Sequence, residues 1–226
     1  MPANDSPGDS NPSKPLKPQK LLSPEARLIA QKNIGHYQEH AASYFEGTKD
    51  HDVRQNIDAL LRAITAPAPL RILDFGCGPG RDLQTFTKLG HCAIGLEGSE
   101  EAARIARSIS GCEVLVQDFF HLDLPEQHFD GVFANAALFH IPKEVLPQVL
   151  RDLWSCLKPG GILFSSNPRG NNEEQWFGER FGLYHDLEGW RTYMSQADFV
   201  EIEHYYRPSG LPFEQQPWLA SVWKKR

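Results

Sequence analysis

The sequence predicts an α/β protein with a mainly parallel sheet and helices on both faces. From Leu70 onward, short apolar runs alternate with segments of helical periodicity, a pattern typical of parallel sheets. A glycine-rich turn follows the first run, where a helix is expected to begin. The chain has 226 residues, of which 40% are hydrophobic and 23% charged, as in a single globular domain. We therefore expect one domain over residues 21–226.

Residues 1–20 are expected to form a disordered tail. They contain five prolines and only three apolar residues, Met1, Ala3 and Leu16. Such a stretch buries too little apolar surface to offset the entropy lost on ordering. It also lacks the contiguous apolar segment of a secretory signal, and no later stretch has the roughly 18 apolar residues that span a bilayer. We therefore expect a cytoplasmic protein without membrane contact.

Two helices are expected to form a cover over residues 21–66, before the first strand. Ser23-Pro24-Glu25 predicts a helix start, with a hydroxyl cap, proline at the first position and an acid in the first turn. One face of this helix then carries Ile34, Tyr37, Ala41 and Tyr44. After a loop, Asp52 is expected to cap a second helix. The apolar face of that helix consists of Val53, Ile57, Leu60, Leu61 and Ile64.

The remaining elements alternate along the chain. The expected parallel strands are Leu70–Phe75, Ala93–Glu97, Glu113–Gln117, Gly131–Asn135 and Ile162–Ser165. The helices between them are expected at Asp82–Leu89, Ser99–Ser108 and Lys143–Leu157, the last closed by Lys158-Pro159-Gly160-Gly161. A polar, aromatic-rich insertion, a helix and two strands follow, at Asn167–Leu187, Glu188–Ala197, Val200–Tyr206 and Trp218–Trp223. The short connection between these two strands predicts an antiparallel final pair.

Charge and cysteine content narrow the class of partner. The net charge is −6 and no basic stripe is present, which argues against binding to nucleic acid through many phosphate contacts. The cysteines include no C-x-x-C pair, so free thiols are expected. No group of His, Asp and Glu residues has the ligand spacing of a metal site. A small-molecule partner is therefore expected, without a metal.

The glycine-rich turn, Asp74–Gly80, is the most informative segment. Ligands of an open parallel sheet bind beyond the carboxyl ends of its strands, and glycines let a nucleotide-like ligand approach the backbone there. The G-x-G-x-x-G fingerprint of NAD-binding proteins requires glycine where Arg81 stands, so NAD is disfavoured. Glu97 follows the second strand, 23 positions beyond Asp74. An acid there can accept hydrogen bonds from both hydroxyls of a ribose.

The pattern D-x-G-x-G-x-G resembles the first motif of class I S-adenosylmethionine-dependent methyltransferases, and the resemblance covers about residues 35–226. It implies a Rossmann-like seven-stranded sheet with an antiparallel last strand, and S-adenosylmethionine as cofactor. In this family, the positions of Asp118 and Phe119 bind adenine, and that of Asn135 lies near the methyl group. The resemblance implies cofactor contacts at Tyr37, Asp74, Gly76, Gly78, Arg81, Glu97, Asp118, Phe119 and Asn135.

Some of these positions have a plainer interpretation. Tyr37 and Tyr44 belong either to an amphipathic helix packed on the core or to a cover whose aromatic faces meet the sulfonium or the substrate. Arg81 is either a partner of the cofactor carboxylate or a solvated surface charge. Methylases of nucleic acid with this fold carry Asn/Asp-Pro-Pro-aromatic after the fourth strand. This chain has Asn135-Ala136-Ala137-Leu138 there, which favours a small acceptor.

Segments outside the cofactor motifs resemble the methyltransferase component of ovothiol biosynthesis: Gly47–Val53, Ser165–Gly170, Tyr184–Glu188, His204–Pro208 and Gln215–Trp223. This resemblance implies methylation of 5-thiohistidine on the imidazole nitrogen next to the side-chain attachment, giving ovothiol A. It also implies functional coupling to a sulfoxide synthase, whose iron-dependent portion this chain lacks. Two alternatives stay open: a methyltransferase for another small acceptor, and a non-catalytic partner that binds the cofactor.

A thiohistidine requires partners for its carboxylate, its ammonium and its ring. Arg169 and Arg207 are expected to bind the carboxylate as bidentate forks, and Asp52 to bind the ammonium unless it serves only as a helix cap. The ring is expected to be held by Tyr44, Asn135, His140, Asn167 and Tyr206. Because the thiolate is the better nucleophile, these contacts must point the nitrogen at the methyl carbon while a donor shields the sulfur. Should a base be needed, His140 is the candidate, unless it merely satisfies a buried backbone group.

Overall fold

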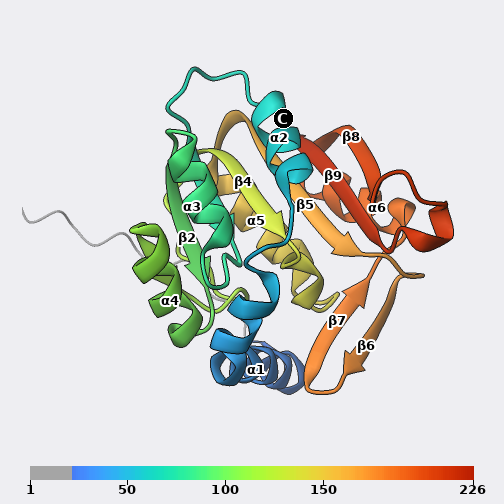
Figure 1. Ribbon diagram of the computed structural model, residues 1–226. Helices are drawn as coiled ribbons and strands as arrows, with labels where there is room; N and C mark the ends of the chain where they lie inside the picture. Colours follow the sequence, from blue (N-terminus) through green and yellow to red (C-terminus); the bar gives the residue numbers. More distant parts are fainter. Residues whose placement is uncertain (1–21) are drawn as a thin grey trace, which may run out of the picture.

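The computed structural model describes residues 22–226, and the tail predicted for residues 1–20 lies outside the described residues. Its centre is a seven-stranded sheet in the order β3-β2-β1-β4-β5-β9-β8 (Figure 1). The strands are β1 (Arg71–Phe75), β2 (Cys92–Glu97), β3 (Val114–Val116), β4 (Phe129–Asn135), β5 (Leu157–Pro168), β8 (Phe199–Arg207) and β9 (Trp218–Lys225). Strands β1 to β5 pair in parallel, and β9 runs antiparallel to both of its neighbours. The predicted sheet with its antiparallel last strand is confirmed.

Helices cover both faces of the sheet, and each face has its own apolar core. Helices α2 (Arg54–Ala63), α3 (Arg81–Lys88) and α4 (Glu100–Ser110) pack on one face, and α5 (Leu146–Cys156) and α6 (Leu187–Gln196) on the other. The first core includes Leu60, Leu83, Phe133 and Phe164, and the second includes Leu153, Trp190 and Trp223. Burial of these side chains provides the main favourable term for folding.

Helix α1 (Pro24–Thr48) lies at the edge of the sheet toward which β2 and β5 point (Figure 1). It begins as predicted, since the Ser23 hydroxyl accepts a hydrogen bond from the N–H of Ala26 at 3.0 Å. The Gln38 side-chain oxygen accepts hydrogen bonds from the Ser99 hydroxyl and from the N–H of Glu101, both at 3.1 Å, which joins α1 to α4. The helix therefore covers the edge where ligands of such sheets bind.

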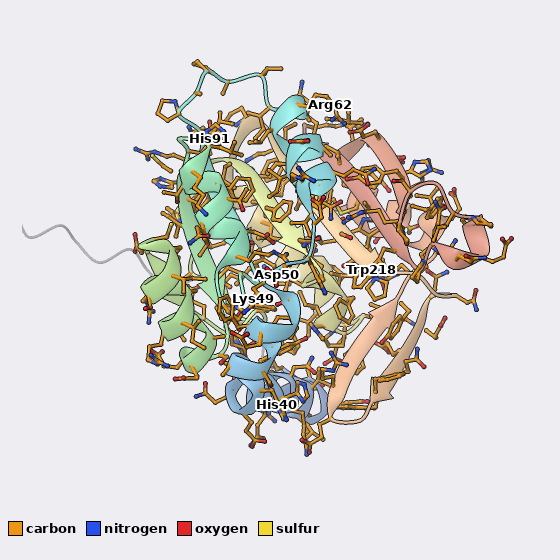
Figure 2. The ribbon with its side chains drawn as sticks, viewed as in Figure 1. His40, Lys49, Asp50, Arg62, His91 and Trp218 are labelled. Carbon is orange, nitrogen blue, oxygen red and sulfur yellow. The ribbon has the colours of Figure 1, made fainter. Side chains whose placement is uncertain are left out.

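The link from α1 to α2 passes the start of α3. Figure 2 labels Lys49 and Asp50 on this link, and Arg81 donates a hydrogen bond to the carbonyl of Thr48 at 3.0 Å. The predicted cap of α2 is wrong by one position, because Val53 precedes the helix and makes no side-chain cap. Asp52 still accepts a hydrogen bond from the first N–H of the helix, that of Arg54, at 3.0 Å.

Two further boundaries differ from the prediction. The insertion predicted without regular structure contains a hairpin, β6 (Glu173–Phe177) and β7 (Arg180–Tyr184). All but the first residue of β6 are exposed, so this strand has no alternation of buried and exposed residues to signal it. Strand β5 begins at Leu157, where Leu157 pairs with Phe129 before a bulge, so residues 158–161 belong to this strand and do not close a helix. Within residues 22–226, no helix is long and apolar enough to cross a membrane.

Candidate active site

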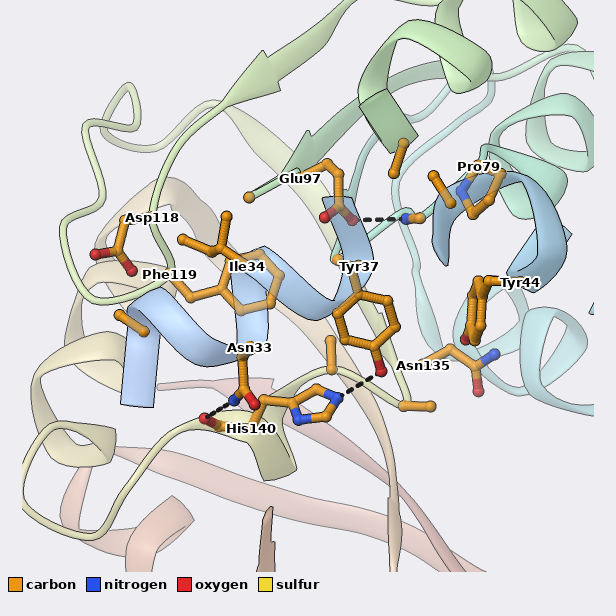
Figure 3. Close-up of a pocket in the computed structure, with 18 of the residues that line it drawn as sticks. Asn33, Ile34, Tyr37, Tyr44, Pro79, Glu97, Asp118, Phe119, Asn135 and His140 are labelled. Atoms are coloured by element: carbon orange, nitrogen blue, oxygen red, sulfur yellow. Dashed lines mark hydrogen bonds between the residues drawn. The ribbon is translucent and has the colours of Figure 1, made fainter. Parts of the chain in front are cut away.

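A pocket lies between α1 and the carboxyl edge of the sheet (Figure 3). It contains about 720 Å³ of space, part of it open to solvent, which is within the range of sites for small ligands and cofactors. Its lining includes many of the predicted site residues: Tyr37, Tyr44, Gly76, Gly78, Glu97, Asp118, Phe119, Asn135 and His140. These residues come from α1, from the last residues of β2 and β4, and from the segments that follow β1, β3 and β4.

The turn after β1 brings the backbone against the pocket. Gly76 has φ of +73°, a left-handed conformation that favours glycine. A Cβ atom at this position would lie 2.5 Å from the Cβ of Ala137 and 3.2 Å from the ring of Phe119. The Gly76 N–H donates a hydrogen bond to the carbonyl of Leu96 at 2.8 Å, which ties the turn to β2. Both conformation and space therefore require glycine here.

Glu97, at the end of β2, is held by two backbone groups. One carboxylate oxygen accepts a hydrogen bond from the N–H of Gly78 and the other from the N–H of Ser99, both at 2.9 Å. Burial raises the pKa of Glu97, and the backbone hydrogen bonds oppose this shift. Each oxygen keeps a further lone pair. The side chain can thus accept hydrogen bonds from two adjacent hydroxyl groups of a ligand.

Asp118 and Phe119, after β3, place an acceptor beside an aromatic ring. One oxygen of Asp118 accepts a hydrogen bond from the N–H of Phe120 at 3.0 Å, which orients the carboxylate. The Phe119 ring packs on Phe75 at a centroid distance of 4.5 Å. A flat heterocycle with an exocyclic amino group fits this combination of apolar surface and acceptor.

Asp74, directly before the glycine turn, carries a buried oxygen without a hydrogen-bond partner among the described residues. Burial raises the pKa of Asp74 well above its usual range, and the nearby Asp82 raises it further. A carboxyl group in this position favours a cationic ligand group or a donor. Asp74 itself is 2% exposed and does not line the pocket. Glu97, Asp118 and Phe119, which do line it, fit a nucleoside cofactor.

His140 and Tyr37 form a buried pair beside the pocket (Figure 3). His140 Nδ1 lies 2.9 Å from the carbonyl of Phe181, which can only accept, so Nδ1 carries the proton. His140 Nε2 then accepts a hydrogen bond from the Tyr37 hydroxyl at 2.9 Å. Burial lowers the pKa of His140 to about 4 and raises that of Tyr37 to about 12. At neutral pH His140 is therefore uncharged and its free lone pair is occupied by Tyr37.

The buried, neutral His140 makes stability depend on pH. Its pKa is about 4 in the folded protein against 6.5 for an ordinary histidine, so between these values the unfolded chain binds more protons. The stability is present above about pH 6.5 and is lost as the pH falls toward 4. We expect His140→Gln to reduce the loss of unfolding free energy between pH 7 and pH 5 by about 2 kcal/mol, measured by urea unfolding. The exposed His51, changed to Gln, is the control. Identical pH dependences in all three proteins would contradict the assignment.

Arg81 does not line the pocket. Its guanidinium forms two hydrogen bonds with the carboxylate of Asp82, at 2.7 and 2.8 Å, and a third with the carbonyl of Thr48. These three hydrogen bonds use three of the five N–H groups of the guanidinium. The same contacts join the start of α3 to the end of α1.

The residues predicted to bind substrate lie in separate places. Tyr44 lines the pocket and contacts Tyr37 edge to face at a centroid distance of 5.4 Å. Exposed Asp52 pairs with Arg54 at 2.6 Å, and Arg207 donates to the backbone carbonyl of Asp52 at 2.9 Å. The pair with Arg54 lowers the pKa of Asp52. Neither Asp52 nor Arg207 lines the pocket.

The other predicted substrate residues lie around the end of β5. The guanidinium carbon of Arg169 lies 3.7 Å from the ring centroid of Phe213 and 5.1 Å from that of Tyr206. The guanidinium also donates a hydrogen bond to the carbonyl of Phe213 at 2.9 Å. Asn167 is 1% exposed, and neither atom of its amide has a partner among the described residues. Arg169, Asn167 and Tyr206 do not line the pocket.

Asn33 and Asn56 are site residues that the sequence did not indicate. Asn33 lines the pocket and holds the hairpin against α1, since its side-chain oxygen accepts a hydrogen bond from the N–H of Phe181 at 2.8 Å. Its amide also donates to the carbonyl of His140 at 3.3 Å. Asn56 donates to the Asn135 side chain at 2.9 Å. In the part of the chain that the structure describes, no three His, Cys, Asp or Glu side chains are grouped to hold a metal ion.

Part of the chain is similar to known methyltransferases. Residues 72–161 match the family model described as "Methyltransferase domain". The chain is 32% identical over 105 residues to a sterol 24-C-methyltransferase of Yarrowia lipolytica, covering 41% of this chain and 26% of that protein. It is 33% identical over 123 residues to a malonyl-[acyl-carrier protein] O-methyltransferase of Erwinia pyrifoliae, covering 54% and 46%. The chain thus matches less than half the length of these relatives.

Solved structures show the same fold over most of the chain. The 1,6-didemethyltoxoflavin-N1-methyltransferase of Burkholderia thailandensis, solved with 1,6-didemethyltoxoflavin and S-adenosylhomocysteine bound, has a TM-score of 0.71 at 19% identity and covers 91% of this chain and 92% of its own. A TehB-like S-adenosylmethionine-dependent methyltransferase of Corynebacterium glutamicum has a TM-score of 0.66 at 19% identity, covering 86% and 100%. The predicted Rossmann-like fold of class I methyltransferases is confirmed.

Proposed function

We propose that this chain is an S-adenosylmethionine-dependent methyltransferase that acts on a small molecule. The observation that carries the proposal is the pocket at the carboxyl edge of the sheet, where Glu97, Asp118 and Phe119 follow successive strands of a methyltransferase fold. A structural neighbour binds S-adenosylhomocysteine together with a small heterocycle. The net charge of −6 and the absence of a basic stripe in the sequence support a small acceptor over a nucleic acid.

The cofactor contacts are assigned from the geometry of the pocket. Glu97 would bind the ribose hydroxyls, with Asp118 and Phe119 on the adenine. The turn through Gly76 and Gly78 would hold the methionine part, near the Tyr37 ring. Asp74 stays a proposed partner of the ammonium group, although it is 2% exposed and does not line the pocket. When bound, S-adenosylmethionine supplies an electrophilic methyl carbon, whose bond to sulfur breaks, with the electron pair remaining on sulfur, as a lone pair of the acceptor binds the carbon. An aromatic face such as that of Tyr37 attracts the sulfonium charge.

The acceptor that we propose is 5-thiohistidine, methylated on its imidazole nitrogen to give ovothiol A. The support is the resemblance of five segments of the sequence, together with Tyr44 and Asn135 in the pocket lining as polar contacts for a small ring. His140 also lines the pocket, but both of its ring nitrogens are occupied by Phe181 and Tyr37. A ring that enters with a free nitrogen lone pair needs no base. This agrees with a neutral His140 whose Nε2 is occupied by Tyr37. The chain then contributes alignment of the nitrogen and exclusion of water.

The carboxylate and ammonium groups of the substrate also need binding partners. Asn167, Arg169, Tyr206, Arg207 and Asp52 stay the proposed partners of the head and ring, although none of them lines the pocket. Binding through these residues would require the side chains at the end of β5 and in the β8–β9 connection to rearrange. The proposed coupling to a sulfoxide synthase rests on the sequence resemblance, and it agrees with the chemistry, because sulfur must be added to histidine before this methylation.

The test is mass spectrometry of a reaction containing the protein, S-adenosylmethionine and 5-thiohistidine, with histidine as the control acceptor. We expect one methyl group on the ring nitrogen of thiohistidine, located by fragmentation, and none on histidine. If S-adenosylhomocysteine binds in calorimetry but no methylated product forms, the thiohistidine assignment is wrong. Another acceptor, or a non-catalytic partner of a synthase, would then be the better interpretation.

A further inference from the structure

Asn56 of α2 is a fully buried polar residue that contacts the pocket only through another side chain. It is 0% exposed, and its amide nitrogen donates a hydrogen bond to the side-chain oxygen of Asn135 at 2.9 Å. Asn135 ends β4 and lines the pocket together with Tyr44 and His140 (Figure 3). Asn56 itself is absent from the pocket lining. A residue in this position can affect a ligand only by orienting Asn135.

Tyr205 of β8 sets the direction of the Asn56 amide. The Tyr205 hydroxyl lies 3.0 Å from the side-chain oxygen of Asn56 and 3.3 Å from the carbonyl of Gln55. Burial raises the pKa of Tyr205, so the hydroxyl keeps its single proton. It donates this proton to the Asn56 oxygen, the shorter of the two contacts. With its oxygen accepting from Tyr205, Asn56 must present its NH2 group to Asn135. The chain of hydrogen bonds therefore runs from Tyr205 through Asn56 to Asn135.

The hydrogen bonds from Tyr205 through Asn56 determine which groups of the Asn135 amide are available to a ligand. The Asn135 oxygen is occupied by Asn56, whereas no described residue accepts a hydrogen bond from the Asn135 NH2 group. A donor left without a protein partner at the edge of a pocket has its full capacity for a ligand. Both hydrogens of the Asn135 NH2 group are therefore available to a ligand, whereas its oxygen already uses one of its two lone pairs for Asn56.

We infer that Asn56 is a positioning residue that fixes the Asn135 amide with its NH2 group toward the methyl acceptor. The inference rests on the proposed function and gives the acceptor a chemical requirement: at this point it must carry an atom that accepts a hydrogen bond. In 5-thiohistidine that atom is the thiolate sulfur. A sulfur lone pair engaged by Asn135 is less available for attack, which leaves the ring nitrogen as the methylated atom. Asn56 and Tyr205 thus act on the choice of nitrogen over sulfur.

The orientation can be tested without any acceptor. In ligand-free protein labelled with ¹⁵N-asparagine, the side-chain NH2 signals of Asn56 and Asn135 are assigned with the Asn56→Leu and Asn135→Asp variants. We expect the Asn56 NH2 protons to exchange slowly with solvent and those of Asn135 to exchange rapidly. A slowly exchanging Asn135 NH2 would show the reverse orientation and overturn the inference.

The effect on the acceptor is tested with Tyr205→Phe and Asn56→Leu. The control is Tyr193→Phe, which removes a half-buried hydroxyl that has no hydrogen-bond partner among the described residues. We expect the Kd for S-adenosylhomocysteine to change less than about twofold in all three, and the Kd for 5-thiohistidine to rise about 5- to 10-fold in the first two only. The ratio of S-methyl to N-methyl product should rise in the same two variants.

The outcomes separate this inference from the proposed function. If wild-type protein methylates thiohistidine but Tyr205→Phe and Asn56→Leu keep the wild-type affinity and product ratio, the positioning role is wrong and the function stands. If wild-type protein does not bind thiohistidine, the proposed acceptor is wrong, and the exchange of the NH2 protons alone decides the orientation of Asn135. A protein that is only destabilised would lose activity without a change in product ratio, which would also overturn the role in selectivity.

Discussion

Replacing Glu97 by glutamine is expected to weaken binding of S-adenosylhomocysteine by about 100-fold or more. The carboxylate accepts backbone hydrogen bonds from Gly78 and Ser99 and keeps one lone pair on each oxygen for a ribose hydroxyl. Glutamine converts one of these oxygens into a donor, which then faces a backbone N–H. Each hydrogen bond to a charged group contributes about 1.5–3 kcal/mol, and about 1.4 kcal/mol corresponds to a factor of ten. Loss of two such bonds gives the expected factor.

The measurement is isothermal titration calorimetry with S-adenosylhomocysteine, accompanied by thermal unfolding of each protein. Glu101→Gln is the matched control, since Glu101 of the neighbouring α4 is partly exposed, does not line the pocket, and pairs its carboxylate with Arg104. We expect this variant to bind as the wild type does. A folded Glu97→Gln protein with unchanged affinity would remove Glu97 from the cofactor site and would contradict the proposed function at its strongest point.

The proposed cofactor side of the pocket could be predicted because its residues stand at the ends of strands or directly after them. Asp74, Glu97, Asp118 and Asn135 each stand at or after the carboxyl end of a predicted parallel strand. Parallel pairing brings those ends to one edge of the sheet, independently of the conformation of the loops. The alternation of apolar runs and helices therefore placed the pocket as well as the fold. Its polar residues could be identified from their position relative to the strands.

The acceptor half depends on contacts that the sequence does not encode locally. Tyr37 and His140 are 103 positions apart, and Asn56 and Tyr205 are 149 apart. Asn33 has its role because the hairpin β6–β7 packs on α1, and that hairpin shows no pattern of buried and exposed residues. Polar residues in a helix gain such partners only when the tertiary structure forms. A resemblance between sequences identified candidates here, but could not say which of them meet.

Replacing Gly76 by alanine is expected to lower the unfolding free energy by about 2–5 kcal/mol. The left-handed conformation, φ +73°, costs a residue with a Cβ about 1–2 kcal/mol. The new methyl group would also meet Ala137 at 2.5 Å and Phe119 at 3.2 Å, and such overpacking costs about 1–3 kcal/mol. Gly90→Ala is the matched control, because Gly90 has φ of +84° but nothing within 4 Å of the added Cβ. Only the conformational cost of about 1–2 kcal/mol is expected there.

The difference between the two alanine variants isolates the crowding around the pocket. The Cβ of Ala137 is bonded directly to the backbone after β4 and cannot rotate away from the new methyl group. Relief of the contact at Gly76 must therefore move the turn or the Phe119 ring. Either movement disturbs the proposed adenine surface or the N–H of Gly78 that holds Glu97. We therefore expect the affinity for S-adenosylhomocysteine, measured by calorimetry, to fall at least tenfold in Gly76→Ala and to stay unchanged in Gly90→Ala. Equal unfolding free energies and equal affinities in the two variants would contradict this prediction. The turn would then accommodate the added methyl group without loss of stability, and the close packing of Gly76 would not contribute to binding.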